Sequence, residues 1–377
     1  MVAGLALGQG PAVKEAAFEG QPALVLSNQK VEFTVTVLGG SLARAALRDG
    51  PAGLNPLWEP VRMARELGKD TKFQGSTGHF VCVDGFGPVS PEERAAGLPG
   101  HGEAHRQQYQ VVRSGAEGNG VVVSLEALLP IVQEKFTRTL RLVEGESVVY
   151  VESRLENLLG FDRPVNWAEH ATVGSPFLAP GETVVDVSGT RSMTRPYPAA
   201  RAGQVERRLQ SGAEFSWPLA PGLDGQPVDL RQTPAELRYL DHATTLVDPA
   251  LKYGWTTALN TARGLIVGWV FRREEFPWVQ YWGQYPPTGK LARGLEFSTQ
   301  PFDVPRREAI GAATMFGAPT YRWLPAKSAI TARFLVFYTR APEGMKRVDA
   351  ITVERGRLLI EDRAAGKQLT LAASLAE

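Results

Sequence analysis

Short stretches in which apolar and polar residues alternate recur along this chain. From Val31 to Val37 every second residue is apolar, and Glu32, Thr34 and Thr36 lie between them. A period of two places all the apolar side chains on one face of an extended strand, whereas a helix needs apolar residues three and four positions apart. The pattern therefore predicts a strand with one buried face, which ends at the pair Gly39–Gly40.

Comparable strand patterns continue along the chain and are joined by turns rich in glycine and proline. The remaining predicted strands are Ser41–Leu47, Phe80–Asp84, Gln108–Arg113, Val121–Leu129, Phe136–Val143, Val148–Leu155, Leu237–Tyr239, Gly254–Leu259, Leu265–Phe271, Trp278–Trp282, Arg293–Phe297, Ser328–Thr339, Arg347–Glu354 and Arg357–Ile360. No window of about 12 residues shows helical spacing, and no internal repeat is apparent. The expected fold class is all-β: a large, mostly antiparallel β-sandwich with less than about a fifth of its residues in helices.

Three segments lack a strand pattern. Pro91 to Leu98 begins with a proline and two glutamates and ends beside a glycine, which predicts one or two turns of helix. We expect Arg62 to Gly78 to be a surface loop. We expect Pro176 to Pro227, rich in proline and glycine, to be an irregular excursion from the sandwich.

Composition bears on the number of domains. The chain has 377 residues, and its 39 glycines and 27 prolines are spread along the whole sequence. This suits many short strands in one unit, because large all-β folds often exceed about 200 residues. We expect a single domain over residues 1–377, with its core at about 24–340 and further strands to 372.

Charge and cysteine content limit the possible partners. The 41 Lys and Arg residues balance 40 Asp and Glu residues, for a net charge of +1, so no nucleic-acid partner is expected. No apolar run reaches the roughly 20 residues that span a bilayer, which predicts a soluble protein without a membrane partner. Cys82 is the single cysteine, which is compatible with a cytoplasmic or an exported protein. These features leave the compartment and the oligomeric state open.

His170 is the first candidate for chemistry. It lies between the strand-like Tyr150–Leu155 and the turn residues Gly174 and Pro176. We therefore expect it at or near the end of a strand, where functional side chains are frequent. The alternative is a histidine that is hydrogen-bonded inside a packed sandwich.

Further histidines and carboxylates raise the question of a metal. His101 and His105 lie within one hexapeptide, and with Glu169 and His170 they include side chains that zinc prefers. No His-Glu-x-x-His or similar spacing fixes two of them on one face. We therefore expect no metal site. The Gly-x-Ser-x-Gly turn of a serine nucleophile is also absent from the sequence.

Two later segments combine aromatic, amide and carboxylate groups. Trp278, Gln280 and Trp282 alternate along one predicted strand and should share a face. Such a face suits the apolar side of a sugar ring, and packing in the core is the alternative. Glu296 is an acid in an otherwise apolar strand. It is either exposed at the edge or solvent face of the sheet, or a buried acid whose altered pKa suits a general base.

The order of these motifs resembles the aldose 1-epimerase, or galactose mutarotase-like, superfamily. A His-Gly pair begins at His101, His170 follows a strand, and the motif Leu-Glu-x-x-Thr-Gln-Pro-Phe contains Glu296. The resemblance extends from Val31 to about Tyr338. It implies a large β-sandwich that acts on a carbohydrate.

The resemblance also implies a role for each matching residue. His170 would be the general acid toward the ring oxygen, and Glu296 would be the general base. His101 would bind the sugar. The stretch Tyr239–His242 is similar to the one that supplies a sugar-binding aspartate in the family, here Asp241.

The sequence departs from the family pattern at two places. The family segment Gly-Arg-x-x-Asn-Arg is replaced by Gln74–His79, and the third residue of the His-Gly-Gly motif is Glu103. Both changes bear on which sugar is bound. We expect Glu103 and the nearby His105 to contact the substrate.

These residues predict an isomerase that interconverts the anomers of a free sugar or sugar derivative. A base removes the proton of the anomeric hydroxyl while an acid protonates the ring oxygen, so the ring opens and recloses on its other face. A sugar should fit between His170 and Glu296. The reaction needs no cofactor, and the expected partner is a small-molecule carbohydrate.

Two other functions remain open at this point. One is a non-catalytic carbohydrate-binding protein on the same fold. The other is a carbohydrate lyase or hydrolase, for which Glu103 and Glu296 would supply the pair of carboxylates.

Overall fold

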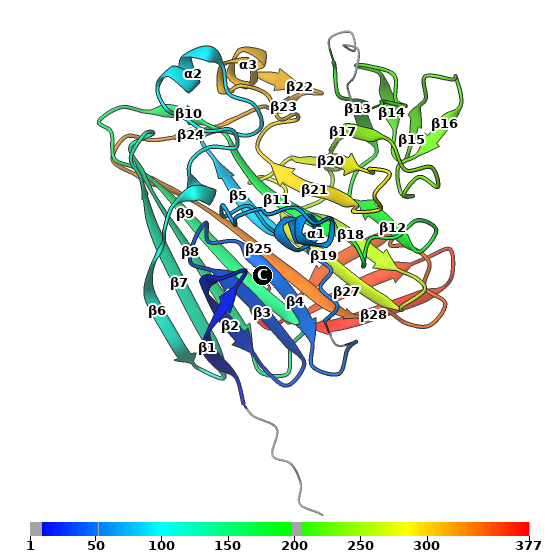
Figure 1. The fold of residues 1–377 in the computed structure, drawn as a ribbon, viewed down its shortest axis with the longest axis horizontal. Coiled ribbons are helices and arrows are strands. Elements are labelled where there is room, and N and C mark those ends of the chain that lie inside the picture. The colour runs from blue at the N-terminus through cyan, green and yellow to red at the C-terminus, as the bar shows by residue number, and fades with distance from the viewer. Residues whose placement is uncertain (1–9, 52, 198–205, 377) are drawn as a thin grey trace, which may run out of the picture.

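The computed structural model describes residues 10–51, 53–197 and 206–376. The structure has 50% strand and 6% helix, which confirms the all-β prediction. Two large antiparallel sheets pack against each other, and smaller sheets and short helices lie around them (Figure 1). No helix within the described ranges is long and apolar enough to cross a membrane.

The first large sheet has eleven strands in the described part of the chain. In spatial order they are β1 (Ala12–Phe18), β2 (Gln21–Ser27), β3 (Val31–Thr36), β4 (Leu42–Leu47), β5 (His79–Val83), β11 (Trp167–Gly174), β21 (Ala292–Ser298), β20 (Trp278–Gln284), β17 (Leu240–Leu246), β13 (Arg191–Thr194) and β14 (Glu214–Ser216). Strands distant in the sequence, such as β5, β11 and β21, are therefore neighbours in its centre.

The second large sheet has eight strands among the described residues. Their order is β12 (Thr183–Val187), β18 (Tyr253–Asn260), β19 (Leu265–Arg272), β25 (Ala329–Arg340), β9 (Val148–Asn157), β8 (Glu134–Val143), β7 (Gly120–Leu129) and β6 (Gln110–Glu117). A C-terminal sheet consists of β26 (Ala350–Glu354), β27 (Arg357–Asp362) and β28 (Lys367–Ala372).

Short elements complete the fold. Three strand pairs are β10 (Arg163–Val165) with β24 (Arg322–Leu324), β15 (Leu219–Pro221) with β16 (Pro227–Asp229), and β22 (Thr314–Met315) with β23 (Ala318–Pro319). The helices are α1 (Pro60–Glu66), α2 (Pro91–Ala95), α3 (Arg306–Ala312) and the 3₁₀ helix η1 (Ala104–Arg106).

The main hydrophobic core fills the space between the two large sheets. In β3 the side chains of Val31, Phe33 and Val35 are fully buried there, as the alternating pattern predicts. A second apolar cluster includes Phe337 of β25 and Leu358 of β27. The C-terminal sheet therefore packs against the outer face of the eight-stranded sheet.

The structure corrects the predicted position of His170. The strand β11 runs through it, so His170 lies in the middle of a strand and not at or near its end. All eight residues of β11 are buried. A strand that is covered on both faces has no alternating pattern, so β11 was difficult to recognise from its residues.

Other expectations for irregular segments were also wrong in part. The segment Arg62–Gly78, expected to be a surface loop, includes most of α1 and several buried side chains. The excursion Pro176–Pro227 contains strands β12 to β15. The residues Leu237–Tyr239 precede a strand instead of forming one, whereas the helical turns after Pro91 are present as α2.

A buried ion pair connects the two large sheets beneath β11. Arg138 of β8 donates to both carboxylate oxygens of Glu169, at 2.7 and 2.6 Å. Trp167 Nε1 donates to the same carboxylate at 3.0 Å. Trp269 Nε1 donates to His79 Nδ1 at 3.1 Å, so a neutral His79 carries its proton on Nε2 and donates to Glu169 at 2.8 Å. These residues form a closed network inside the core.

The network keeps Glu169 ionised despite its burial. Burial alone would raise the pKa of this carboxyl, but Arg138 and His79 outweigh it, and the pKa of Glu169 is lowered. Burial lowers the pKa of His79 and keeps its ring neutral. The stabilisation by Glu169 is therefore present above its unfolded-state pKa and is lost as the pH falls through the lower folded-state pKa.

We predict that Arg138→Met lowers the free energy of unfolding by about 3–5 kcal/mol, because it leaves the Glu169 carboxylate buried without its cation. Urea-induced unfolding monitored by circular dichroism measures this change. Arg357→Met is the matched control, because Arg357 pairs with Glu354 at the surface and such pairs contribute about 0–1 kcal/mol. Equal destabilisation by the two variants would contradict the role of the buried pair.

Candidate functional site

One row of side chains crosses the outer face of the eleven-stranded sheet, opposite the core. The register places Phe80 of β5 beside His170 of β11 and Gln280 of β20 beside Glu296 of β21. In the pairing of β11 with β21, Glu169 is opposite Phe297 and Thr172 is opposite Gly294, so the same register brings His170 level with Glu296. Directly opposite residues in antiparallel strands have neighbouring side chains on the same face. His170 and Glu296 are therefore brought together by strands that are far apart in the sequence.

A cavity of about 250 Å³ lies over this row. Small-molecule sites typically measure about 300–1,000 Å³, so this cavity suits a compact ligand. Its lining residues are Trp58, Ser76, Phe80, His101, His170, His242, Trp282, Glu296 and Asp303.

The His170–Glu296 pair is the most distinctive feature of the cavity. His170 Nε2 lies 3.3 Å from Glu296 Oε1, which has no hydrogen-bond partner among the described residues. His170 Nδ1 lies 2.9 Å from the Thr172 hydroxyl, which donates to the His170 carbonyl at 3.4 Å. The proton of a neutral His170 therefore lies on Nδ1, and Nε2 faces the carboxyl. A Cβ atom at Gly294 would lie 2.0 Å from Oε1, so glycine leaves the space that Glu296 occupies.

The geometry corrects one expectation about substrate placement. A separation of 3.3 Å between His170 and Glu296 leaves no room for a sugar atom between them. A ligand has to lie over both side chains, on the cavity side of the sheet.

Burial favours the uncharged form of each partner. It raises the pKa of Glu296 well above its usual value, and the Asp303 carboxylate adds to the rise. Burial lowers the pKa of His170 well below its usual value, and His101 lowers it further. Near neutral pH the pair therefore shares one exchangeable proton besides the Nδ1 proton of His170, and it has no net charge whether the shared proton is on the carboxyl or is transferred to the imidazole.

His101 reaches the cavity from a tight loop. Its φ is 66°, and the Gly87 N–H donates to its Nδ1 at 3.3 Å. Burial lowers the pKa of His101, so the ring is neutral and carries its proton on Nε2. Gly102 has a φ of +72°, and a Cβ atom there would lie 2.2 Å from the Val83 carbonyl oxygen. The His-Gly pair is thus required for the loop to approach the end of β5 so closely.

A second imidazole and carboxylate also line the cavity. His242 Nε2 lies 3.0 Å from Gln280 Oε1 and 3.5 Å from Asp303 Oδ1. Arg195 Nε lies 3.0 Å from the same Asp303 oxygen. Gln280 can accept the Nε2 proton of a neutral His242, so it orients this histidine.

Two tryptophan rings give the cavity an aromatic wall. The ring centroids of Trp58 and Trp282 are 6.4 Å apart, with the planes at 75°. Trp282 is also 6.2 Å from the His170 ring. The Trp58 backbone N–H donates to the Thr172 carbonyl at 2.9 Å, which attaches this loop to β11.

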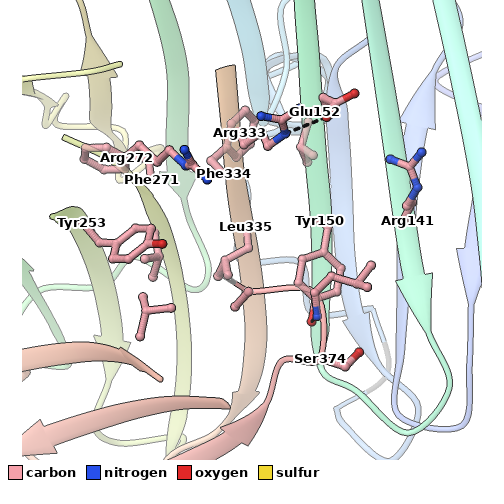
Figure 2. A pocket seen from close by; sticks show the side chains of 15 residues that line it. Arg141, Tyr150, Glu152, Tyr253, Phe271, Arg272, Arg333, Phe334, Leu335 and Ser374 are labelled. Atoms are coloured by element: carbon pink, nitrogen blue, oxygen red, sulfur yellow. Dashed lines mark hydrogen bonds and ion pairs between the residues drawn. The ribbon is translucent and has the colours of Figure 1, made fainter. Parts of the chain in front are cut away.

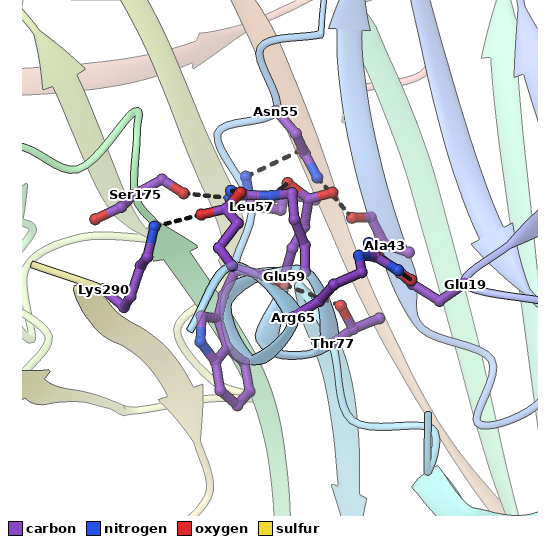
Figure 3. Close-up of polar contacts among 12 residues, drawn as sticks. Glu19, Ala43, Asn55, Leu57, Glu59, Arg65, Thr77, Ser175 and Lys290 are labelled. Atoms are coloured by element: carbon purple, nitrogen blue, oxygen red, sulfur yellow. Dashed lines mark hydrogen bonds and ion pairs between the residues drawn. The ribbon is translucent and has the colours of Figure 1, made fainter. Parts of the chain in front are cut away.

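Polar contacts around α1 fix the segment that carries Trp58 (Figure 3). Asn55 accepts the Leu57 N–H at 3.1 Å and donates to the Ala43 carbonyl at 2.9 Å. On the far side of α1, Lys290 forms an ion pair with Glu66. The helix is therefore held to both neighbouring parts of the sheet, and the position of the Trp58 ring follows from it.

Of the residues predicted from the sequence, four line the cavity: His101, His170, Trp282 and Glu296. Gln280 lies directly behind His242. Trp278 shares the face of β20 with Trp282, but it is fully buried, and its indole N–H donates to the Pro319 carbonyl at 2.9 Å.

Three predicted substrate contacts lie elsewhere. The Glu103 carboxylate accepts the backbone N–H groups of Ile131 and Val132, at 2.8 and 3.0 Å, and so connects two loops. His105 is buried beside Phe80, outside the cavity lining. Asp241 is on the other face of β17.

The position of Asp241 follows from the period of two along a strand. It is fully buried and pairs with Arg208 at 2.6 Å. The next residue, His242, points to the opposite face and lines the cavity. The stretch identified by sequence therefore reaches the cavity, but through His242 and not through Asp241.

Five lining residues were not predicted from the sequence as site residues: Trp58, Ser76, Phe80, His242 and Asp303. Trp58 and Ser76 come from segments without a strand pattern, and no local signal connects them to His170. His242 is the last residue of the stretch Tyr239–His242, in which Asp241 was selected, and Asp303 directly follows the motif that contains Glu296. No group of three or more His, Cys, Asp or Glu side chains with metal-binding geometry occurs among the described residues.

Comparison with known proteins identifies solved structures with a similar fold. No protein-family model and no curated protein matches the sequence. A galactose mutarotase-like protein from Clostridium acetobutylicum matches with a TM-score of 0.60 and 13% identity, over 88% of this chain and 99% of that one. A galactose mutarotase related enzyme from Lactobacillus acidophilus matches with a TM-score of 0.56 and 12% identity, over 85% of this chain and 99% of that one.

A third match is part of a longer protein. A TPR-domain containing protein from Parabacteroides distasonis has a TM-score of 0.57 and 11% identity, over 85% of this chain and 48% of that one. At such identities the similarity concerns the fold and leaves the activity to be argued from the site. This chain therefore has the galactose mutarotase-like fold that the order of its sequence motifs predicts.

Proposed function

We propose that this protein interconverts the anomers of a free aldose or aldose derivative, with Glu296 as general base and His170 as general acid. The observation that carries the proposal is the buried His170–Glu296 pair, 3.3 Å apart in a cavity with an aromatic wall. Burial gives the pair one shared proton, and acid–base catalysis at neutral pH needs such a proton.

The separation of the pair suits the two oxygens that react. The anomeric hydroxyl and the ring oxygen are bonded to the same carbon, so their catalysts have to be close together on one side of the sugar. Glu296 removes the hydroxyl proton while His170 Nε2–H protonates the ring oxygen. The bond between the anomeric carbon and the ring oxygen breaks, and an open-chain aldehyde forms. After rotation of the aldehyde both protons return, and the ring closes on its other face.

The remaining lining residues suit a sugar. The rings of Trp58 and Trp282 offer apolar surfaces for the C–H face of the ring. His101, His242 and Asp303 offer hydrogen-bonding groups for hydroxyls. The described lining has two carboxylates and no lysine or arginine, which favours an uncharged sugar over a sugar phosphate.

The structure gives no support to hydrolysis by Glu103 and Glu296. Glu103 binds backbone groups outside the cavity, so the two carboxylates do not face one substrate. A non-catalytic carbohydrate-binding protein would have the same aromatic wall, and the experiments below separate it from an enzyme.

We predict that Glu296→Gln lowers the rate of anomer exchange by about 10²- to 10⁴-fold, because it keeps the shape of the side chain and removes the base. Polarimetry of a freshly dissolved aldose measures the rate, and calorimetry should show that sugar binding survives. Glu103→Gln is the matched control and should change the rate little, because Glu103 is outside the cavity. Exchange at nearly the wild-type rate in Glu296→Gln would contradict the proposal.

We predict that the exchange rate falls at both low and high pH, because the active pair holds one proton. At low pH the pair gains a second proton as the pH drops through the lowered pKa of His170. At high pH the pair loses its proton as the pH rises through the raised pKa of Glu296. A rate that rises continuously with pH would instead indicate exchange catalysed by hydroxide in solution.

We predict that Trp282→Ala weakens sugar binding about tenfold without unfolding the protein, because the ring lines the cavity. Calorimetric titration with the same aldose measures the affinity. Trp323→Ala is the control, because Trp323 is 59% exposed and lies outside the cavity. Unchanged affinity in a folded Trp282→Ala protein would rule out the stacking role.

A further inference from the structure

A second and larger cavity, of about 540 Å³, lies on the outer face of the eight-stranded sheet (Figure 2). Its floor consists of side chains from β8, β9, β25, β19 and β18, and the C-terminal residues Ser374–Ala376 close one side. The proposed active site is on the outer face of the other sheet. This groove is therefore a separate site, and its ligand is independent of the proposed function.

Three arginines rise from the floor of the groove. Arg272 is directly opposite Tyr253 on the neighbouring strand, and Arg141 is directly opposite Tyr150. Arg333 comes from β25, between these two strand pairs. Figure 2 shows Arg272 and Arg333 on one side of the groove, with the rings of Tyr253 and Tyr150 on either side of Leu335.

The described side chains that line the groove carry a net positive charge. Among its described lining residues are three arginines and one acid, Glu152, which pairs with Arg333 at 2.7 Å. The acids that pair with Arg141 and Arg272 are Glu117, at 2.8 Å, and Glu274, at 3.7 Å, and neither lines the groove. A guanidinium has five N–H donors, so one carboxylate leaves several donors for a ligand.

The two tyrosine rings are held in place differently. The Tyr150 hydroxyl donates to Glu146 at 2.5 Å, which fixes the ring. The Tyr253 hydroxyl is buried and has no hydrogen-bond partner among the described residues. Lys252 Nζ lies 5.0 Å from the centroid of the Tyr253 ring. A buried phenol group without a partner is unfavourable, and a ligand oxygen in the groove would complete its hydrogen bonding.

The span of the groove sets the size of its ligand. Tyr150 and Tyr253 lie on β9 and β18, with β25 and β19 between them. Neighbouring strands are about 4.8 Å apart, so the two tyrosines are separated by about 14 Å. One sugar ring cannot touch both, whereas a short chain of rings can.

We propose that this groove binds an acidic oligosaccharide, with its carboxylates on Arg272 and Arg333 and its ring faces against Tyr150 and Tyr253. Guanidinium groups bind carboxylates through paired N–H donors, and tyrosine rings pack against the C–H faces of sugars. The apolar side chain of Leu335 on the floor of the groove can pack against a sugar ring, whereas it offers no hydrogen bond to a small inorganic anion. A ligand that contacts both the tyrosines and the arginines therefore has to contain sugar rings and negative charges in one molecule.

Calorimetric titration of the full chain with trigalacturonate at fixed ionic strength tests this proposal. We expect trigalacturonate to bind in this groove and the neutral maltotriose not to bind there. The double variant Arg272→Gln/Arg333→Gln should weaken the affinity by about tenfold or more. Tyr253→Phe keeps the ring and removes only the hydroxyl, and it should also weaken binding.

Two controls make the outcome specific. Arg357→Gln removes a comparable exposed arginine from the C-terminal sheet and should leave the affinity unchanged. Trp282→Ala should also leave it unchanged, although the same change weakens sugar binding in the proposed active site, and this separates the two sites. The proposal is overturned if trigalacturonate fails to bind the wild-type protein, or if the double variant binds it equally well. It is also overturned if sodium sulfate displaces trigalacturonate at a concentration that supplies the same number of negative charges.

Discussion

The buried pair of Arg138 and Glu169 is the interaction on which the site depends. It joins β8 of one sheet to β11 of the other, and β11 also carries His170. Because side chains alternate along a strand, fixing Glu169 in the core fixes His170 on the opposite face. A slip of β11 by one residue would place a carboxylate in the cavity and the histidine in the core. The ion pair makes such a slip costly, so it sets the register of the site.

Two buried carboxylates on neighbouring strands have pKa values that are shifted in opposite directions. Glu169 and Glu296 are 0% and 2% exposed. Arg138 and His79 lower the pKa of Glu169, whereas burial and the nearby Asp303 raise the pKa of Glu296. Burial next to a cation gives a structural anion, and burial next to a neutral imidazole gives a group that can exchange a proton. This contrast separates the carboxylate that holds the sheets together from the one that suits catalysis.

The fold could be predicted from the sequence because most strands have one buried face. The alternation at Val31–Thr36 and the turns between strands were sufficient for the sandwich. β11 was harder, because it is buried on both faces and its sequence does not alternate. The stretch around His170 was then taken for a strand end.

The candidate site could be predicted only where a motif carries its residues. His101, His170 and Glu296 were found by their order along the chain, and the structure brings them to one cavity. Trp58 and Ser76 were missed, because the tertiary fold places their loop over β11 and no local pattern records this. Asp241 was chosen in place of His242, since a motif identifies a stretch and the strand period decides which residue faces the ligand.

The most direct test of the account is exchange spectroscopy of the wild-type protein with a panel of unsubstituted aldoses at anomeric equilibrium. NMR exchange peaks between the two anomeric protons report ring opening without any change in composition. If His170 and Glu296 catalyse anomer exchange, at least one aldose should show protein-dependent exchange peaks well above the spontaneous rate. A sugar that binds in the His170–Glu296 cavity and shows only spontaneous exchange would contradict catalysis and identify the protein as a carbohydrate-binding protein.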